Sequence, residues 1–186
     1  AFLKVLLKKV SATTFNAITV DSDTSTNDMA VIFATNKAKN SKIYNVLDPK
    51  LQEFEKALHR LCLNLAKQIV VDGEGAKKFI TVKIIGAKSI SMAKNIGFSV
   101  ANSPLVKTAI AGEDPNWGRI IMAVGKSGEN IIANKVQLKI GKYLVAEHSK
   151  QAKDYNEKHL KEYMKWDSIH IEVNLNIGTS SHVVYT

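Results

Sequence analysis

The sequence feature that most constrains the fold is a strict alternation near the end of the 186-residue chain. Apolar and polar side chains exchange at every position from 169 to 177: Ile169, Ile171, Val173, Leu175 and Ile177 alternate with His170, Glu172, Asn174 and Asn176. A period of two places each set on its own face of a sheet. This segment is therefore predicted to be a half-buried strand, and the rest of the chain must supply a layer that covers its apolar face.

Helical periodicity predicts several further elements. One long helix is traced by apolar residues three or four positions apart: Leu51, Phe54, Leu58, Leu61, Leu65 and Ile69. Shorter helices are predicted over 3–10, from Ser89 to Val100 and over 155–165, and strands over 79–85, 135–140, 143–146 and 182–186. This mixed order predicts an α+β fold with a layered sheet, and a hydrophobic content of 45% suits a single domain over 1–186.

Three more apolar runs are interpreted as strands: Phe15 to Val20, Met29 to Thr35 and Ile120 to Val124. The last two are uninterrupted, which is typical of strands covered on both faces. Residues 36–49 form a long connection, expected to be exposed or functional. The strand at 182–186 is expected to lie at a sheet edge that further residues or a partner chain continue.

Residues 103–125 combine a predicted helix, a dense polar loop and the last of those runs. Ser103 and Pro104 are typical of a helix start, and Gly112 is expected to end the helix in a left-handed conformation. The loop over 113–119 carries two acids, an amide, an indole and a guanidinium between two buried elements. Such a loop is a candidate functional site.

The composition narrows the classes of partner. A formal charge of +9 makes nucleic acid a partner to consider, but Arg60 and Arg119 are the only arginines and the lysines are scattered along the chain. We therefore interpret the lysines mainly as solvated surface. No apolar run approaches the roughly 20 residues of a membrane span. The lone Cys62 lies on an apolar helical face, so a buried inert thiol in a reducing, cytoplasmic setting is expected.

Two short polar segments are candidate sites. The loop from Asp21 to Asp28 lacks the glycine and glutamate of a calcium loop, so it is either a self-satisfied turn or a support for a neighbouring catalytic group. Glu74, between two glycines after the long helix, can approach a ligand closely, and its carboxylate suits a cationic amine; a solvated turn is the alternative. The histidines have no zinc spacing, and no serine has a nucleophile-elbow context. No metal or cofactor is expected.

Three long motifs, taken together, resemble the ArgJ family of ornithine acetyltransferases, also called glutamate N-acetyltransferases. The motifs are VDSDTSTND (20–28), DGEGAKKFITV (72–82) and ANSPLVKTAIAGEDPNWGRIIMAVGKSG (101–128), and the resemblance extends to Tyr163-Met164-Lys165. Ser22 departs from the family, which usually has glycine there. The resemblance implies an αββα layered sandwich of the DmpA/ArgJ type, and a DmpA-type aminopeptidase is the nearest alternative. A basic nucleic-acid-binding module is the alternative from another class.

The resemblance also implies which residues react. The family precursor cleaves itself before a threonine, so this chain resembles a β chain whose nucleophilic threonine is expected just before Ala1. The implied reaction moves an acetyl group from N-acetylornithine to glutamate through an acetyl-threonine, with acetyl-CoA a possible further substrate. The implied partner is an α chain from the same precursor, in an α2β2 heterotetramer. Glu74 is the implied substrate-binding residue, while Asn116, Trp117 and Arg119 are expected to support the site, with an Asp114–Arg119 ion pair.

Overall fold

The computed structural model describes residues 2–41, 43, 45 and 48–186. Within them, six strands form one mixed sheet in the order β4-β3-β2-β5-β1-β6. The strands are β1 (Phe79–Ala87), β2 (Gln137–Ile140), β3 (Tyr143–Glu147), β4 (Lys150–Gln151), β5 (Ser168–Asn174) and β6 (Ser180–Tyr185). β1 and β5 run parallel, and the other neighbouring pairs are antiparallel. A mixed sheet with helices packed on it confirms the α+β prediction.

The alternation that predicted the central strand is confirmed. Ile169, Ile171 and Val173 of β5 are buried, with at most 1% of each exposed. Pairing continues beyond the strand, because the Leu175 amide donates to the Ile85 carbonyl and the Ile177 amide to the Gly86 carbonyl, each at 2.9 Å. β6 forms one edge of the sheet, as predicted for the last strand.

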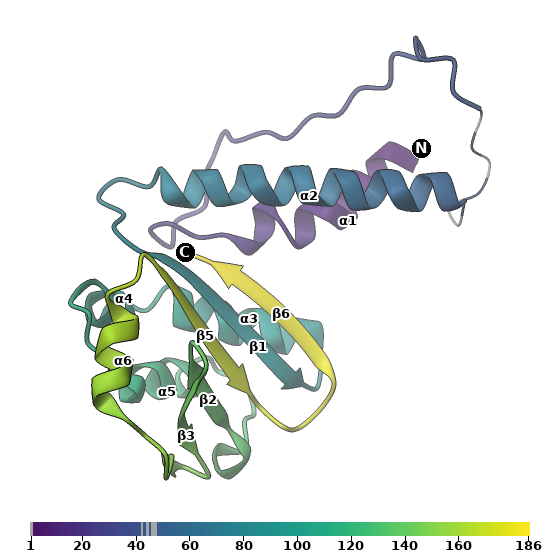
Figure 1. Ribbon diagram of the computed structural model, residues 1–186. Helices are drawn as coiled ribbons and strands as arrows, with labels where there is room; N and C mark the ends of the chain where they lie inside the picture. The colour runs from purple at the N-terminus through teal and green to yellow at the C-terminus, as the bar shows by residue number, and fades with distance from the viewer. Residues whose placement is uncertain (1, 42, 44, 46–47) are drawn as a thin grey trace.

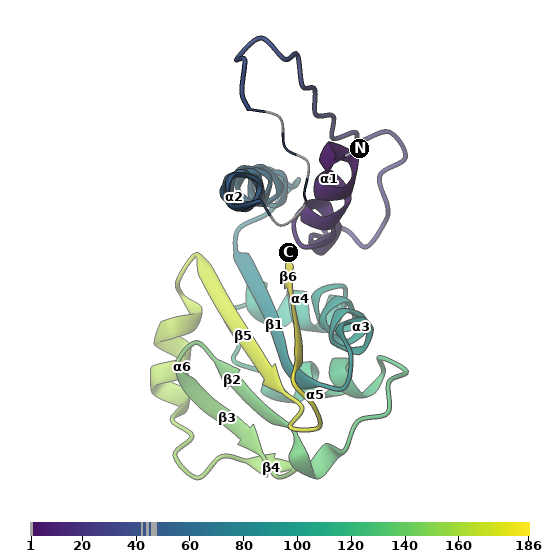
Figure 2. The same cartoon turned by 90° about the vertical axis from the view of Figure 1, so that its right-hand side faces the viewer.

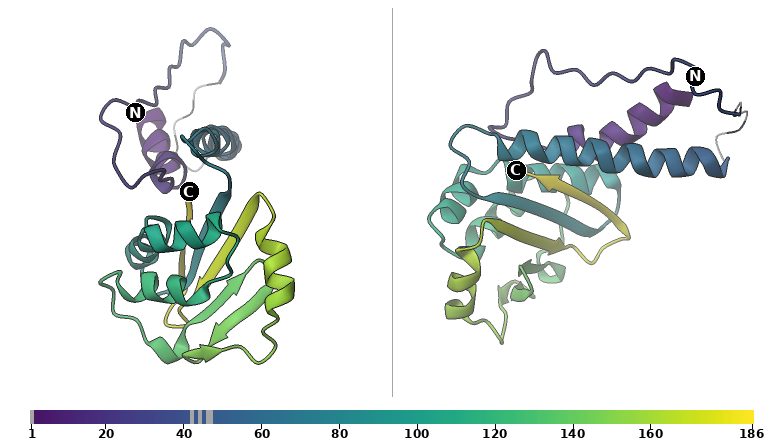
Figure 3. Two further views of the ribbon diagram at one scale, coloured as in Figure 1. Left: turned by 90° about the vertical axis from the view of Figure 1, so that its left-hand side faces the viewer. Right: turned by 45° about the horizontal axis from the view of Figure 1, so that its top comes forward.

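Three helices cover one face of this sheet (Figure 3). They are α3 (Ile90–Ala101), α4 (Pro104–Ala111) and α5 (Trp117–Gly125). α3 lies so close that a Cβ on Gly97 would sit 2.9 Å from Val184 Cγ2 on β6. Its inner face carries the buried residues Ala93, Ile96 and Val100, whereas Ile90 is 65% exposed. The opposite face of the sheet carries the Lys83–Glu172 ion pair at 2.8 Å.

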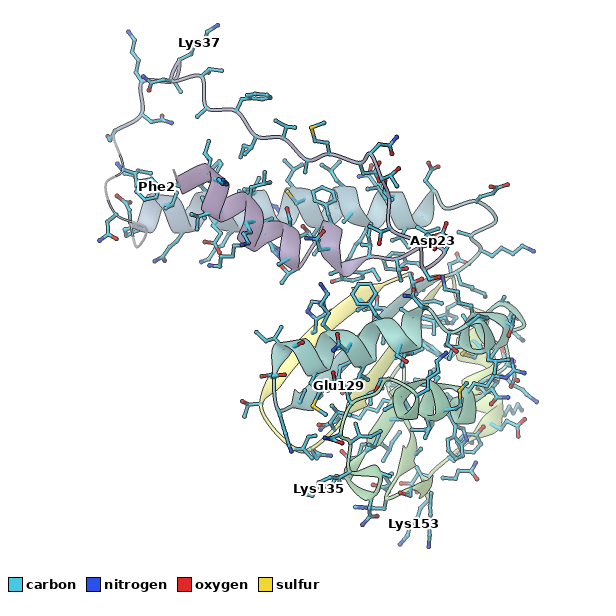
Figure 4. All side chains as sticks on the ribbon, turned by 180° about the vertical axis from the view of Figure 1, so that it is seen from behind. Phe2, Asp23, Lys37, Glu129, Lys135 and Lys153 are labelled. Atoms are coloured by element: carbon cyan, nitrogen blue, oxygen red, sulfur yellow. The ribbon has the colours of Figure 1, made fainter. Side chains whose placement is uncertain are left out.

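The first two helices lie outside this layered body. α1 (Phe2–Ala12) and α2 (Pro49–Val71) pack against each other beyond the end of the sheet, and the connection between them extends further out (Figures 1 and 2). α2 begins where the Asp48 carboxylate accepts a hydrogen bond from the Lys50 amide at 2.9 Å. Lys37, in the connection, lies far from the sheet (Figure 4). The described part of 36–49 is mostly exposed, and residues 42, 44, 46 and 47 of that predicted connection lie outside the described residues.

Two of the predicted strands, Phe15 to Val20 and Met29 to Thr35, are wrong because neither forms a continuous ladder with a neighbouring strand. Residues 15–17 form a short 3-10 helix, and Ile18 makes a single bridge to Tyr185. Residues 29–35 are extended but unpaired, with Met29 81% and Phe33 83% exposed. An apolar run becomes a strand only when a partner supplies the hydrogen bonds. Within the described residues, no sheet reaches this segment.

The third predicted strand, residues 120–124, is wrong because the run belongs to helix α5. Ile120, Ala123 and Val124 are buried, at the spacing of one helical face, whereas Met122 is 39% exposed. A short apolar run cannot be told from a buried helix by periodicity alone. The helix start was visible in Asn116, whose Oδ1 accepts a hydrogen bond from the Arg119 amide at 3.4 Å.

The charged helix predicted over 155–165 is α6 (Glu157–Met164), and it is anchored more firmly than its composition suggested. Leu160 and Met164 are buried in the main core. The Tyr163 hydroxyl accepts a hydrogen bond from the His170 amide at 3.0 Å, and its ring lies over Gly141 in the β2–β3 turn. Gly141 has a φ of 58°, and a Cβ there would sit 2.7 Å from Tyr163 Cζ. α6 therefore depends on a glycine in the turn.

Candidate functional site

The Glu74 corner, residues 72–75, connects α2 to β1 and presents an available carboxylate. Glu74 is exposed, and no hydrogen bond or ion pair engages its side chain within the described residues. Gly75 adopts a φ of 74° with open space where a side chain would be. A carboxylate on such a turn can meet a cationic group without obstruction. The corner is a short loop between two long elements, as the sequence indicated.

The loop over residues 20–28 satisfies much of its own hydrogen bonding. Asp21 Oδ1 accepts from the Asp23 amide at 2.9 Å, and Ser25 Oγ accepts from the Asp28 amide at 3.2 Å. Ser22 adopts a φ of 78°, which explains why glycine suits this position. Of the two interpretations of this loop, the self-satisfied turn has direct support in these bonds. Among the residues described, no group of three His, Cys, Asp or Glu side chains could hold a metal ion.

The structure brings the Glu74 corner and this loop together. A Cβ on Gly73 would lie 3.0 Å from Val20 Cγ1, so the two segments are in contact. A wide open cavity extends between α2 and the connection, and both Asp72 and residues 19–28 line it. The Thr19 hydroxyl donates to Asn102 Oδ1 at 2.7 Å, which ties the beginning of the loop to the end of α3.

Helix α4 supplies a second tie, through a lysine that sequence reasoning missed. Lys107 Nζ donates a hydrogen bond to the Val20 carbonyl. Burial lowers the pKa of this ammonium, and the Asp21 carboxylate opposes part of that shift. The only sequence signal was the placement of Lys107 within the third motif.

A further tie lies on the other side of the Glu74 corner and was also missed. Lys78 Nζ contacts Glu113 Oε1 at 2.9 Å, the Met164 carbonyl at 3.0 Å and the Trp166 carbonyl at 3.2 Å. The Lys78 side chain is only 11% exposed. Glu113 reaches it from a left-handed backbone conformation, with a φ of 56°, directly after α4.

The predicted end of α4 is therefore wrong in one detail. Gly112 has a φ of −84°, and the left-handed residue is Glu113. Ser103 precedes the helix as predicted, but its hydroxyl makes no capping hydrogen bond and is buried without a described partner. Pro104 at the first turn needs no amide partner, which is consistent with a start that lacks a side-chain cap.

The expected Asp114–Arg119 ion pair is also absent from the described structure. Arg119 Nη1 donates instead to the Leu105 carbonyl and to Thr108 Oγ1, each at 3.0 Å, and so fixes α5 to α4. Asp114 accepts from Asn116 Nδ2 at 3.1 Å. Asn116 thus caps the start of α5, and Arg119 connects α5 to α4.

Cys62 and the histidines lie away from the Glu74 corner. Cys62 is buried, and burial raises the pKa of its thiol, as expected for an inert cysteine. His182 faces α3 from β6 with 7% of its surface exposed, and its Nε2 has no described partner. No helix described in the structure is long and apolar enough to cross a membrane.

Comparison with known proteins agrees with the three motifs. The ArgJ family profile matches residues 1–186. A protein of Mesorhizobium japonicum named arginine biosynthesis bifunctional protein ArgJ is 46% identical over 99% of this chain and 45% of its own length. A protein of the same name from Gluconobacter oxydans is 47% identical over 99% of this chain and 43% of its own length. The chain thus spans less than half the length of these relatives.

A solved structure shares the fold. The crystal structure of arginine biosynthesis bifunctional protein argJ from Bacillus halodurans superposes with a TM-score of 0.92 and is 40% identical. The match covers 98% of this chain and 85% of that one. Since the family profile matches from end to end and the relatives exceed 40% identity, this chain belongs to the ArgJ family.

Proposed function

We propose that the protein to which this chain belongs is a glutamate N-acetyltransferase that moves an acetyl group from N-acetylornithine to glutamate in arginine biosynthesis. The observation that carries the proposal is the family match over residues 1–186, which includes the motif around Glu74. The exposed Glu74 carboxylate has no hydrogen-bond or ion-pair partner among the described residues. A carboxylate pairs with the ammonium group of an amino-acid substrate. Glu74 is assigned to substrate binding, in a cytoplasmic enzyme that needs no cofactor.

The proposed chemistry uses a threonine that precedes this chain. Its hydroxyl oxygen attacks the acetyl carbonyl of N-acetylornithine while its own α-amine accepts the hydroxyl proton. The carbon–nitrogen bond breaks, ornithine leaves with that proton, and an acetyl ester remains on the threonine. The glutamate amine then attacks the ester and regenerates the hydroxyl. The family resemblance places the oxyanion hole in the α chain, and acetyl-CoA is a possible alternative donor.

The proposal includes a second chain cut from the same precursor. The curated relatives are covered to about 45% of their length, whereas the solved Bacillus halodurans chain is covered to 85%. A solved chain of nearly this length, beside relatives about twice as long, supports a precursor that is divided into two chains. We assign the second chain as the partner, in an α2β2 assembly.

The exposed apolar surface supports the same partner. Most of the exposed large hydrophobic side chains lie in the first 71 residues, outside the layered body. Met29, Val31 and Phe33 are at least 55% exposed on an unpaired extended segment, and Leu61 and Leu65 are exposed on α2. Patches of this kind mark sites of protein association. A strand from the α chain beside residues 29–33 would supply the missing hydrogen bonds.

The test uses the full-length protein with N-acetylornithine and glutamate, and mass spectrometry to follow N-acetylglutamate. Glu74→Gln is expected to lower kcat/KM about 10- to 100-fold, as expected for the loss of one charge-assisted contact. The free energy of unfolding is expected to change by less than about 0.5 kcal/mol, because the side chain is exposed. Asp154→Asn, which alters an exposed carboxylate before α6, is the matched control.

Unchanged kinetics in Glu74→Gln would remove Glu74 from the site. Release of amines from small peptide amides without acetyl transfer would replace the proposal with a DmpA-type aminopeptidase. Nucleic-acid binding that weakens steeply with salt, without either activity, would favour the basic binding module.

A further inference from the structure

The Glu74 corner depends on its two flanks for its position. Its own backbone bonds include the Asp72 amide to the Gln68 carbonyl at 2.9 Å, the Gly73 amide to the Val70 carbonyl at 3.2 Å and the Ala76 amide to the Gly73 carbonyl at 3.0 Å. The carboxylate itself has no described partner. A short turn with a positive φ at Gly75 moves easily unless its neighbours are fixed. The contacts on either side therefore determine where Glu74 points.

On the first flank, Lys107 holds the segment against which the corner packs. Its ammonium donates to the Val20 carbonyl, and the Val20 side chain contacts Gly73. The same segment is also bonded to strand β6, because the Thr19 amide donates a hydrogen bond to the Tyr185 carbonyl at 3.0 Å. Val20 is thus fixed between the sheet edge and α4, and it forms the wall beside Gly73.

On the second flank, Glu113 holds the chain four residues after Glu74. It pairs with Lys78, whose ammonium also caps two carbonyls at the end of α6. The Lys78 side chain is largely buried, so the bond to Glu113 compensates a desolvated charge. Removing Glu113 leaves that ammonium with only carbonyl partners.

Both anchors belong to α4 or to the loop that directly follows it. Lys107 lies on α4, and Glu113 follows its end, while Arg119 fixes α4 through the Leu105 carbonyl and Thr108 Oγ1. We infer that Lys107 and Glu113 are positioning residues, which fix the two flanks of the Glu74 corner and so set where its carboxylate meets a substrate ammonium. The inference rests on the proposed role of Glu74. It explains why the motif over 101–128 accompanies the motif over 72–82.

The test compares Lys107→Met, Lys107→Arg and Glu113→Gln in the full-length protein. Lys107→Met is expected to raise KM for the amino-acid substrate about tenfold, equivalent to one charge-assisted hydrogen bond, with kcat within about twofold. Lys107→Arg keeps a hydrogen-bond donor, so its KM is expected to stay close to that of the parent protein. Glu113→Gln keeps the shape of the side chain but removes its charge. It tests the same positioning role if Lys107→Met does not fold.

Hydrogen exchange provides a readout that is independent of acetyl transfer. Amides of residues 72–78 are expected to exchange faster in Lys107→Met and Glu113→Gln than in the parent protein. Lys83→Met is the matched control, since it breaks the 2.8 Å pair with Glu172 on the open sheet face. It is expected to leave exchange at 72–78 and KM unchanged.

The outcomes separate the two proposals. Unchanged exchange at 72–78 in both anchor variants, or an equal KM effect from Lys83→Met, would overturn the positioning role. A parent protein that transfers no acetyl group would contradict the proposed function, while the exchange result would still decide whether Lys107 and Glu113 order the corner.

Discussion

Several polar side chains on α3, α4 and α5 act on backbone groups. Lys107 holds the Val20 carbonyl, Arg119 holds the Leu105 carbonyl, and the Ser99 hydroxyl donates to the Ala123 carbonyl at 2.6 Å. Charged donors to carbonyls fix segments at little risk of alternative pairing, because the acceptors cannot rotate away. The arrangement suits a site that must stay rigid while one exposed carboxylate binds a substrate.

His182 is expected to make the stability of this part of the protein depend on pH. Burial, and secondarily the charge of Lys94, lowers the pKa of the imidazole, which therefore stays neutral in the folded state. The unfolded chain then binds more protons. The contribution of the neutral imidazole to the free energy of unfolding is therefore fully present above the ordinary histidine pKa of about 6.5. It is lost as the pH falls below that value.

The measurement is the unfolding temperature of the full-length protein at pH 7.5 and pH 5.5, for the parent and for His182→Gln. The parent is expected to lose more stability between the two values than the variant, which has no imidazole to protonate. An equal loss in both proteins would show that His182 is not the group responsible.

At the level of elements, the turn at Gly141 joins the β2–β3 hairpin to α6. Gly141→Ala is expected to lower the free energy of unfolding by about 2 kcal/mol or more. The φ of 58° disfavours any side chain by about 1–2 kcal/mol, and the new Cβ would collide with the Tyr163 ring. Chemical denaturation measures the loss.

Two other glycines separate these causes. Gly128 has a φ of 77° but open space around a Cβ. Gly128→Ala is therefore expected to lose only the free energy that the positive φ costs, with no collision added. Gly125, in α5, has neither constraint, and alanine there is expected to be neutral or stabilising by up to about 1 kcal/mol. A loss in Gly141→Ala no larger than in Gly128→Ala would contradict the contact with Tyr163.

Sequence periodicity predicted that elements exist better than it predicted what covers them. The alternation at 169–177 and the helical spacing of 51–69 both mark elements that formed as predicted. The apolar face predicted for the helix is nevertheless largely exposed, and at least 42% of each of four of its residues is accessible: Phe54, Leu61, Leu65 and Ile69. The run at 120–124 was misinterpreted because five apolar residues fit a helix as well as a strand. Residues 29–35 have a strand-like composition but no described neighbour with which to pair.

The candidate site was only partly predictable for a related reason. Glu74 stood out because glycines flank it, and a local pattern is visible in a sequence. Lys78 and Lys107 did not stand out, and Glu113 stood out only as an acid of the loop over 113–119, because their roles come from contacts between residues 35 to 88 positions apart. Such pairs follow from the fold and not from spacing.

At the scale of the whole molecule, the structure has two unlike parts. The sheet lies with helices α3, α4, α5 and α6 in one part, and α1, α2 and their connection form the other (Figure 1). The first part encloses a continuous core, whereas the second leaves large apolar side chains exposed. The second part has the character of one half of an interface. The proposed α chain would cover it, and the Glu74 corner lies where the two parts join.

The most direct test of the account is intact mass and N-terminal sequencing of the purified full-length protein. The account predicts two chains that co-purify, with the chain containing this sequence beginning at a threonine. A single uncut chain that still transfers acetyl groups from N-acetylornithine to glutamate would contradict it.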